Sequence, residues 1–283
     1  MATVLLALGA ALLYGLSDFF GGIVSRRASV WSVAAVTQLT AVVVMGAAAL
    51  LFAGRPEPED WWWGALAGLG TGFGTGFLYR GLAAGRMGVV APLSAVGAAL
   101  VPVAVGLATG ERPPLLTWIG IGCAFPAIWL VSSSAEPAGN ANAPRGRLGQ
   151  GVLDGLLAGL GFGLMFSALG QVADTAGLWP LAMAEVTSVP AVIGLATLMG
   201  HAWWPRQRSA WLGTIVGTLA VAATVFFLLA TQSGLLTVAA VLSSLYPVFT
   251  VLLAAIVLHE RIHGPQAIGL VLAAIAVALV AVA

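Results

Sequence analysis

Ten apolar segments, each close to the length of a membrane-spanning helix, dominate this chain of 283 residues. A helix needs about 20 apolar residues to cross the hydrocarbon core of a bilayer. Only 7% of the residues are charged, whereas soluble domains average roughly 25%. We therefore predict an all-α, multi-pass integral membrane protein. Its ten transmembrane helices are expected at residues 3–24, 30–52, 61–79, 87–109, 116–131, 151–173, 179–199, 211–230, 237–258 and 265–283.

The two halves of the chain resemble each other. Residues 88–120 align without gaps with residues 237–269 at an offset of 149, which places Glu111-Arg112 on Glu260-Arg261. Each half holds five apolar segments, so the two copies cross the membrane in opposite directions. Inverted repeats of this kind are typical of secondary transporters, in which the substrate site lies between the repeats near the bilayer midplane.

A polar segment separates the two halves. Residues 136–150 are rich in Pro, Gly and Asn, as linkers are. We therefore predict a first five-helix repeat at 1–135, a linker at 136–150 and a second five-helix repeat at 151–283.

All eleven Lys or Arg residues are arginines, and they are distributed unevenly between the two sides of the membrane. The loops after even-numbered segments carry only Arg55 and Arg112. Cytoplasmic loops are enriched in basic residues, so we predict that the loops after odd-numbered segments lie in the cytoplasm. Both termini then lie on the outer side of the inner (cytoplasmic) membrane. The nine arginines on the other side are Arg26, Arg27, Arg80, Arg86, Arg145, Arg147, Arg206, Arg208 and Arg261.

An H-E-x-x-H motif occupies residues 259–263. On a helix, such histidines share one face and can bind zinc, with the glutamate as general base. An intramembrane zinc metalloprotease is therefore the alternative function. Against it, only the Glu-Arg pair recurs in the first half, as Glu111-Arg112, and Pro265 would disrupt a helix at this point. We expect no metal site and no enzymatic activity, and we interpret the Glu-Arg pair as a helix-capping element.

Glycines in the third segment suggest close helix packing. Gly68, Gly72 and Gly76 are spaced four residues apart, as are Gly70 and Gly74. Such spacing allows neighbouring helices to approach closely. No soluble strand precedes these glycines, so they do not form a nucleotide-binding loop.

The repeated motifs resemble those of EamA-type transporters of the drug/metabolite transporter superfamily. Residues 242–280 contain the Pro-Val-Phe run, the Glu-Arg turn and the glycine of the last helix, and Tyr14-Gly15 resembles the aromatic-glycine pair of the first helix. The first half departs from the pattern, with Ala98 where the motif has proline. The resemblance implies ten helices around a central cavity lined by helices 1–4 and 6–9, and transport by alternating access. It names no substrate, and in that family both termini are commonly inside.

Two carboxylates lie near the middle of apolar segments. Asp18 is about 7 Å from the midpoint of the first segment, and Glu185 is about 6 Å from the midpoint of the seventh, toward the other face. A charged group at such depth costs roughly 2.5–3.5 kcal/mol and usually faces a cavity or a partner. Both are candidates for a substrate, proton or cation site. The alternatives are an ion pair between Asp18 and Arg80, and an interfacial Glu185 that reaches water.

Three more polar side chains complete the candidate substrate-binding set. Tyr14 precedes Asp18 by four residues and shares its helix face, unless it only packs against lipid or the core. Tyr246 adjoins Pro247, whose kink could open backbone groups to a cavity or serve packing alone. Gln38 either lines the cavity or forms an interhelical hydrogen bond.

These observations predict a secondary transporter that moves a small organic metabolite or drug across the cytoplasmic membrane by alternating access. A proton or another cation is the candidate coupling ion. The chain has no ATP-binding segment, so we expect no cofactor and a gradient as the energy source. The expected partners are a small-molecule substrate and the lipid bilayer, without nucleic acid, because no basic cluster is present. A membrane scaffold without a substrate is a further alternative.

Overall fold

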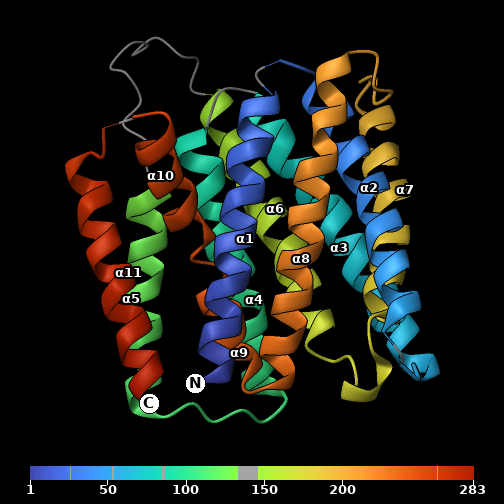
Figure 1. Ribbon diagram of the computed structural model, residues 1–283. Coiled ribbons are helices and arrows are strands. Elements are labelled where there is room, and N and C mark those ends of the chain that lie inside the picture. Colours follow the sequence, from blue (N-terminus) through green and yellow to red (C-terminus); the bar gives the residue numbers. More distant parts are fainter. Residues whose placement is uncertain (26, 53, 84–86, 133–145, 260) are drawn as a thin grey trace.

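The computed structural model describes residues 1–25, 27–52, 54–83, 87–132, 146–259 and 261–283, with 82–83, 87–89, 91–92, 132 and 146–150 described in their backbone only. Helices are the only regular secondary structure in these residues (Figure 1). The helices are α1 (Ala2–Ser25), α2 (Val30–Leu51), α3 (Pro58–Ala83), α4 (Met87–Ala108), α5 (Leu115–Ser132), α6 (Gly146–Leu169), α7 (Trp179–Leu198), α8 (Gly213–Gln232), α9 (Leu236–Ser243), α10 (Tyr246–Val257) and α11 (Gly264–Val282), with short 3₁₀ turns η1 (Asp174–Ala176) and η2 (Arg208–Leu212).

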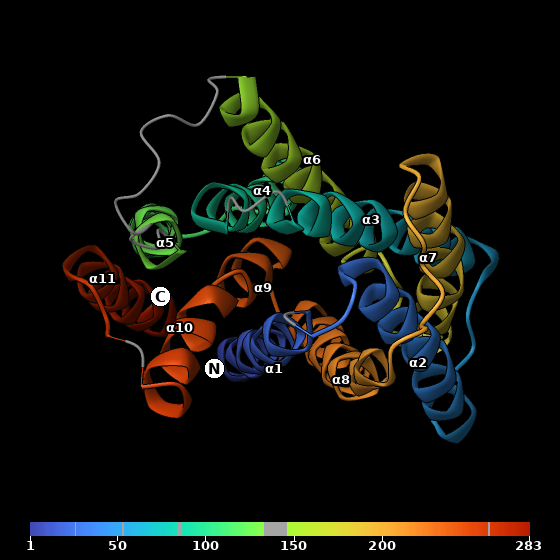
Figure 2. The same ribbon diagram turned by 90° about the horizontal axis from the view of Figure 1, so that it is seen from above.

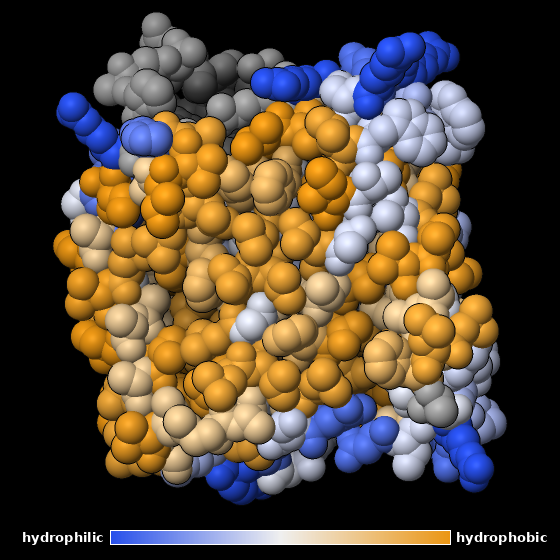
Figure 3. All heavy atoms as spheres, in the orientation of Figure 1, coloured by the Kyte–Doolittle hydropathy of each residue, from blue (hydrophilic) through white to orange (hydrophobic). Residues whose placement is uncertain are grey.

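The ten predicted transmembrane helices are all present. By length and composition, α1, α2, α6, α7, η2 with α8, α9 with α10, and α11 can each cross a bilayer. The shorter apolar stretches Leu93–Ala108 and Leu115–Val131 belong to α4 and α5, and the glycine-rich α3 packs between α6 and α7. Figure 3 shows a broad hydrophobic band between two hydrophilic ends. Such a band matches the hydrocarbon core of a membrane.

The helices form two inverted repeats of five spans, as the sequence predicts. In Figure 1, α1 begins at the lower end of the molecule and α6 begins at the upper end. Shifted by 149 residues, the bounds of α4 become 236 and 257, which are the first residue of α9 and the last residue of α10. Of the predicted linker at 136–150, residues 136–145 lie outside the described residues. The remaining residues, 146–150, belong to α6, which begins at Gly146.

The two repeats are interlocked rather than side by side (Figure 2). The third helix of each repeat packs against the first two helices of the other, so α3 contacts α6 and α7 while α8 contacts α1 and α2. Likewise α4 packs against α6, and α9 and α10 pack against α1. The second helices, α2 and α7, pair with each other, as do the last helices, α5 and α11. These reciprocal contacts define an approximate twofold relation between the repeats.

Glycines allow the closest of these contacts. A Cβ atom at Gly68 would meet the Thr187 side chain and the Ala184 carbonyl oxygen on α7. A Cβ atom at Gly70 would lie 2.6 Å from the carbonyl oxygen of Gly161 on α6. The two glycine rows of α3 therefore face different helices of the second repeat, which confirms the close approach that their spacing predicts.

The ninth span is broken in the middle. α9 ends at Ser243 and α10 begins at Tyr246. Pro247 has no backbone N–H, and its ring would clash with the carbonyl of Ser243, four residues earlier, in a continuous helix. Its repeat partner is Ala98, and α4 runs through that position without interruption. The departure of the first half from the motif thus has a direct structural consequence.

Candidate functional site

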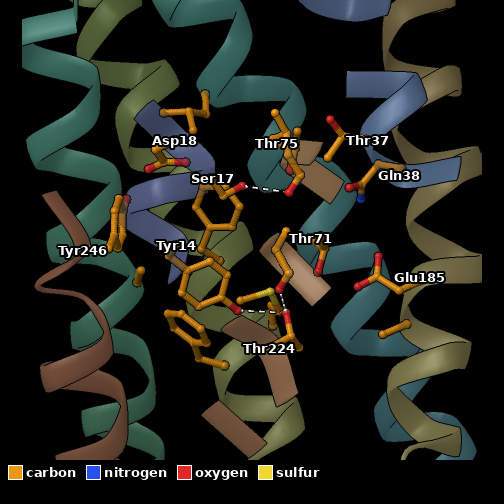
Figure 4. Close-up of a pocket in the computed structure, with 18 of the residues that line it drawn as sticks. Tyr14, Ser17, Asp18, Thr37, Gln38, Thr71, Thr75, Glu185, Thr224 and Tyr246 are labelled. Atoms are coloured by element: carbon orange, nitrogen blue, oxygen red, sulfur yellow. Dashed lines mark hydrogen bonds between the residues drawn. The ribbon is translucent and has the colours of Figure 1, made fainter. Parts of the chain in front are cut away.

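A cavity of about 110 Å³ lies in the middle of the helical bundle, and Figure 4 shows its polar lining. The lining residues come from α1, α2, α3, α4, α6, α7, α8 and α10, which are the eight spans that the family resemblance implies. They are Tyr14, Ser17, Asp18, Thr37, Gln38, Thr71, Thr75, Leu78, Tyr79, Ala98, Phe162, Met165, Phe166, Leu169, Ala184, Glu185, Val216, Ala220, Thr224 and Tyr246.

All five predicted substrate-binding residues line this one cavity. Tyr14 and Asp18 come from one face of α1, Gln38 from α2, Glu185 from α7 and Tyr246 from the first turn of α10. Figure 4 shows Asp18 and Tyr246 on one side and Gln38 and Glu185 on the other. Residues separated by more than 200 positions in the sequence therefore converge, and both repeats contribute to the cavity.

Tyr14 is the best-anchored side chain of the set. Its hydroxyl shares a hydrogen bond of 3.0 Å with the hydroxyl of Thr224 on α8, and its ring meets Phe166 and Tyr246 edge-on. The next residue, Gly15, lets α10 approach, because a Cβ atom there would lie 2.8 Å from the Tyr246 carbonyl oxygen. The aromatic-glycine pair thus places a ring in the cavity and a bare backbone against α10.

The same arrangement recurs in the second repeat. Phe162 lines the cavity, and a Cβ atom at Gly163 would lie 2.6 Å from the Val101 side chain of α4. Phe162 has no hydroxyl, however, so the two halves of the cavity differ in polarity.

The two carboxylates of the cavity have no hydrogen-bond donor among the described residues. Glu185 is only 7% exposed, well inside α7, so it is not the interfacial carboxylate of the alternative interpretation. Asp18 also lines the cavity, but it is exposed rather than buried. Buried polar groups are normally paired, so the unpaired Glu185 requires an explanation, and the second unpaired carboxylate of the same cavity, Asp18, belongs to it.

The alternative ion pair between Asp18 and Arg80 is not formed. The Arg80 guanidinium binds Asp154 on α6 instead, with its Nε 2.7 Å from Oδ1, and lies over the ring of Phe77. Tertiary packing places α6, rather than α1, beside the end of α3. Arg80 is therefore already paired and does not neutralise the cavity.

Gln38 both lines the cavity and forms an interhelical hydrogen bond, the two alternatives that the sequence left open. It lines the cavity, and its Nε2 donates a hydrogen bond of 2.8 Å to the Ser188 hydroxyl on α7. That hydroxyl in turn donates to the backbone carbonyl oxygen of Glu185. The contact thus joins the two second helices next to the acidic side chain.

Sequence reasoning missed several polar residues of the lining. Thr71 and Thr75 lie four residues apart on α3, so they share a face, but the glycines between them dominate the pattern. Tyr79 was placed at the end of the third segment, whereas α3 continues to Ala83. Thr224 lies in an apolar span, where a lone threonine is an unremarkable helix residue.

The H-E-x-x-H motif does not form a helix. α10 ends at Val257, His259 has a positive φ of 55°, and His263 caps the start of α11. Glu260 lies outside the described residues. The two histidines are therefore not on one helical face, and no cluster of three His, Cys, Asp or Glu in the described parts of the chain could hold a metal ion. The zinc-enzyme alternative has no support in this geometry.

The first copy of the Glu-Arg pair does cap helices, as predicted. Glu111 accepts hydrogen bonds of 2.5 and 3.0 Å from the backbone N–H groups of Leu236 and Thr237 at the start of α9. Arg112 donates to the carbonyl oxygen of Leu107 at the end of α4. Both charges thus complement helix ends, where backbone groups lack partners.

Comparisons with known proteins agree with this architecture. The family model described as "EamA-like transporter family" matches twice, over residues 1–133 and 149–282. No curated protein matches the chain in sequence. Among solved structures, 22 chains match. One crystal structure of a protein aligns over 98% of this chain and 95% of its own, with a TM-score of 0.73 and 18% identity, a similarity that concerns the fold alone.

Proposed function

The chain belongs to the EamA-like transporter family of the drug/metabolite transporter superfamily, and from this premise we propose that it is a secondary transporter of a small organic metabolite or drug. The cavity between the two repeats is its substrate site, and Tyr14, Asp18, Gln38, Glu185 and Tyr246 contact the substrate. One observation carries the proposal: these side chains converge from both inverted repeats on one cavity that holds two unpaired carboxylates.

The repeat architecture supports transport by alternating access. Inverted repeats can exchange conformations, so that the same site opens first to one side of the membrane and then to the other. Each repeat contributes its first four spans to the cavity, and the third helix of each repeat packs against the other repeat. A shift between the repeats would therefore change the access to the cavity.

The two carboxylates supply a means of coupling. Asp18 lies toward the end of α1 and Glu185 toward the start of α7, so they occupy different depths along the transport direction. A proton or another cation that binds either group changes the charge of the cavity. Transport then depends on an ion gradient or on the substrate gradient itself, and no nucleotide is consumed.

The placement of the protein in the cell is part of this proposal. We place it in the inner (cytoplasmic) membrane, with both termini outside. The repeat limits at residues 135 and 151 likewise remain predictions.

The first test is ligand binding to purified protein. A library of metabolites and drugs that covers anionic, neutral and cationic compounds is screened by thermal unfolding in detergent. A ligand at 100 times its dissociation constant adds about 2.7 kcal/mol to the stability of the native state. We expect one chemical class to raise the melting temperature, and Asp18→Asn and Glu185→Gln to abolish the shift. A hit is then followed as counterflow into proteoliposomes.

Asp174→Asn is the matched control, because Asp174 is an exposed carboxylate in η1, away from the cavity. It should respond to ligands as the wild type does. The transporter proposal fails if no compound of any charge gives a shift that depends on cavity residues, or if zinc and chelators alone move the melting curve.

A further inference from the structure

We propose that the substrate is an organic cation, a positively charged molecule with an apolar body, held between Asp18 and Glu185 inside an aromatic enclosure. This assignment of a substrate class rests on the proposed transport function. It is drawn from how charge is balanced in the membrane-embedded part of the chain.

The acidic side chains differ in whether they accept hydrogen bonds. Among the described residues, acids that lie in or against the helix bundle either accept hydrogen bonds or face the cavity. Three of them accept two hydrogen bonds each: Asp60 from Glu57 and Ala173, Glu111 from Leu236 and Thr237, and Asp154 from Arg80. Glu57, Glu59 and Asp174 also receive none, but they are exposed and lie outside the cavity, so among the described acids only Asp18 and Glu185 are both unpaired and part of the cavity lining. The fold therefore satisfies its structural carboxylates and leaves two free in the cavity.

The basic side chains lie away from the cavity. No arginine or histidine is among the described residues that line the cavity, and the sequence contains no lysine. By sequence position, every arginine falls between helices or in the first or last turn of one. Arg80, which belongs to the last turn of α3, is bound to Asp154. The described residues therefore supply no counter-charge to the cavity, so the carboxylates are balanced either by a proton or by a cationic molecule that enters it.

Aromatic side chains form much of the cavity wall. Five aromatic rings line the cavity beside the carboxylates, and polar hydroxyl groups are interspersed among them. Aromatic faces attract cations, most strongly where water is excluded, and the same rings can cover an apolar body. The rings are those of Tyr14, Tyr79, Phe162, Phe166 and Tyr246.

The alternatives fit the cavity less well. An anion would meet two like charges in one cavity, where the low dielectric of a membrane-embedded site strengthens the repulsion. A neutral molecule would displace water from around both carboxylates without compensating them, so each carboxylate would have to take up a proton, whereas a cation compensates them directly. A cation satisfies them, and a site that leaves its own polar groups unpaired rejects analogues that lack the matching group.

The test uses compounds matched in shape but not in charge. A panel of arylalkylamines and alkylamines, beginning with phenethylamine, is compared with the corresponding alcohols and carboxylic acids, beginning with 2-phenylethanol and 3-phenylpropanoic acid. Binding to the purified full chain is measured by calorimetry and thermal shift. We expect amines to bind at least about tenfold more tightly than their neutral and anionic partners. Asp18→Asn and Glu185→Gln should each remove most of this preference, and Asp18→Glu should retain part of it.

The possible results of the binding test separate the substrate class from the transport function. Equal or tighter binding of alcohols or acids overturns the assignment, as does the absence of any response to the amine panel. If instead the wider library yields an anionic or neutral ligand that depends on cavity residues, the transport function stands and only the substrate class falls. An amine preference that persists in both amide variants would place the cation elsewhere and also overturn the proposal. Melting curves and gel filtration of each variant without ligand show whether it is folded.

Discussion

At the scale of single residues, the environment of each acid separates structural from functional carboxylates. Asp154 and Asp18 both lie in apolar spans, and the sequence alone gives them similar standing. The structure gives Asp154 a guanidinium partner and gives Asp18 an open cavity. Substitution by asparagine should therefore destabilise the protein at position 154 but not at position 18.

We expect Asp154→Asn to lower the free energy of unfolding by about 2 kcal/mol. Breaking a fully buried pair costs about 3–5 kcal/mol, and the 35% exposure of the Arg80 side chain reduces that figure. Asp18→Asn removes a charge that no described residue compensates, so stability should stay equal or rise. Chemical unfolding in detergent measures both. A comparable loss in Asp18→Asn would show that Asp18 has a structural partner.

At the scale of elements, the helix ends and breaks carry the long-range organisation. The loop between α4 and α5 in the first repeat caps α9 in the second through Glu111. Pro247 breaks the ninth span between Ser243 and Tyr246, and Tyr246, at the start of α10, lines the cavity. Both features fix the position of the ninth span relative to the first repeat.

We predict that Glu111→Gln loosens the start of α9. The amide retains an acceptor but loses the charge, and charge-assisted hydrogen bonds contribute about 1.5–3 kcal/mol each. The backbone amides of Leu236 and Thr237 should exchange their hydrogens about tenfold faster, which hydrogen–deuterium exchange with mass spectrometry can follow. Glu59→Gln is the control, because Glu59 is an exposed acid in the first turn of α3. Unchanged protection at α9 would mean that the cap contributes nothing.

At the scale of the whole molecule, the arginine asymmetry predicts how the protein is oriented in the membrane. It predicts that both termini lie outside, whereas the family resemblance implies that they lie inside. We expect a tag at the N-terminus to be accessible in intact cells and a tag inserted in residues 136–150 to become accessible only after the membrane is permeabilised. The reverse pattern would overturn the orientation, but it would leave the fold and the cavity as they are.

The sequence by itself determined the ten spans, the repeat and its offset of 149, and five of the cavity residues. This works because a bilayer forces every span to satisfy its own backbone, so hydrophobicity marks the spans and polar residues within them stand out. Only the tertiary structure decided that Arg80 pairs with Asp154, that Thr71, Tyr79 and Thr224 join the cavity, and that residues 258–259 and 261–263 lie outside a helix. Those outcomes depend on which helix faces which across two interlocked repeats, and this information is not local to any segment.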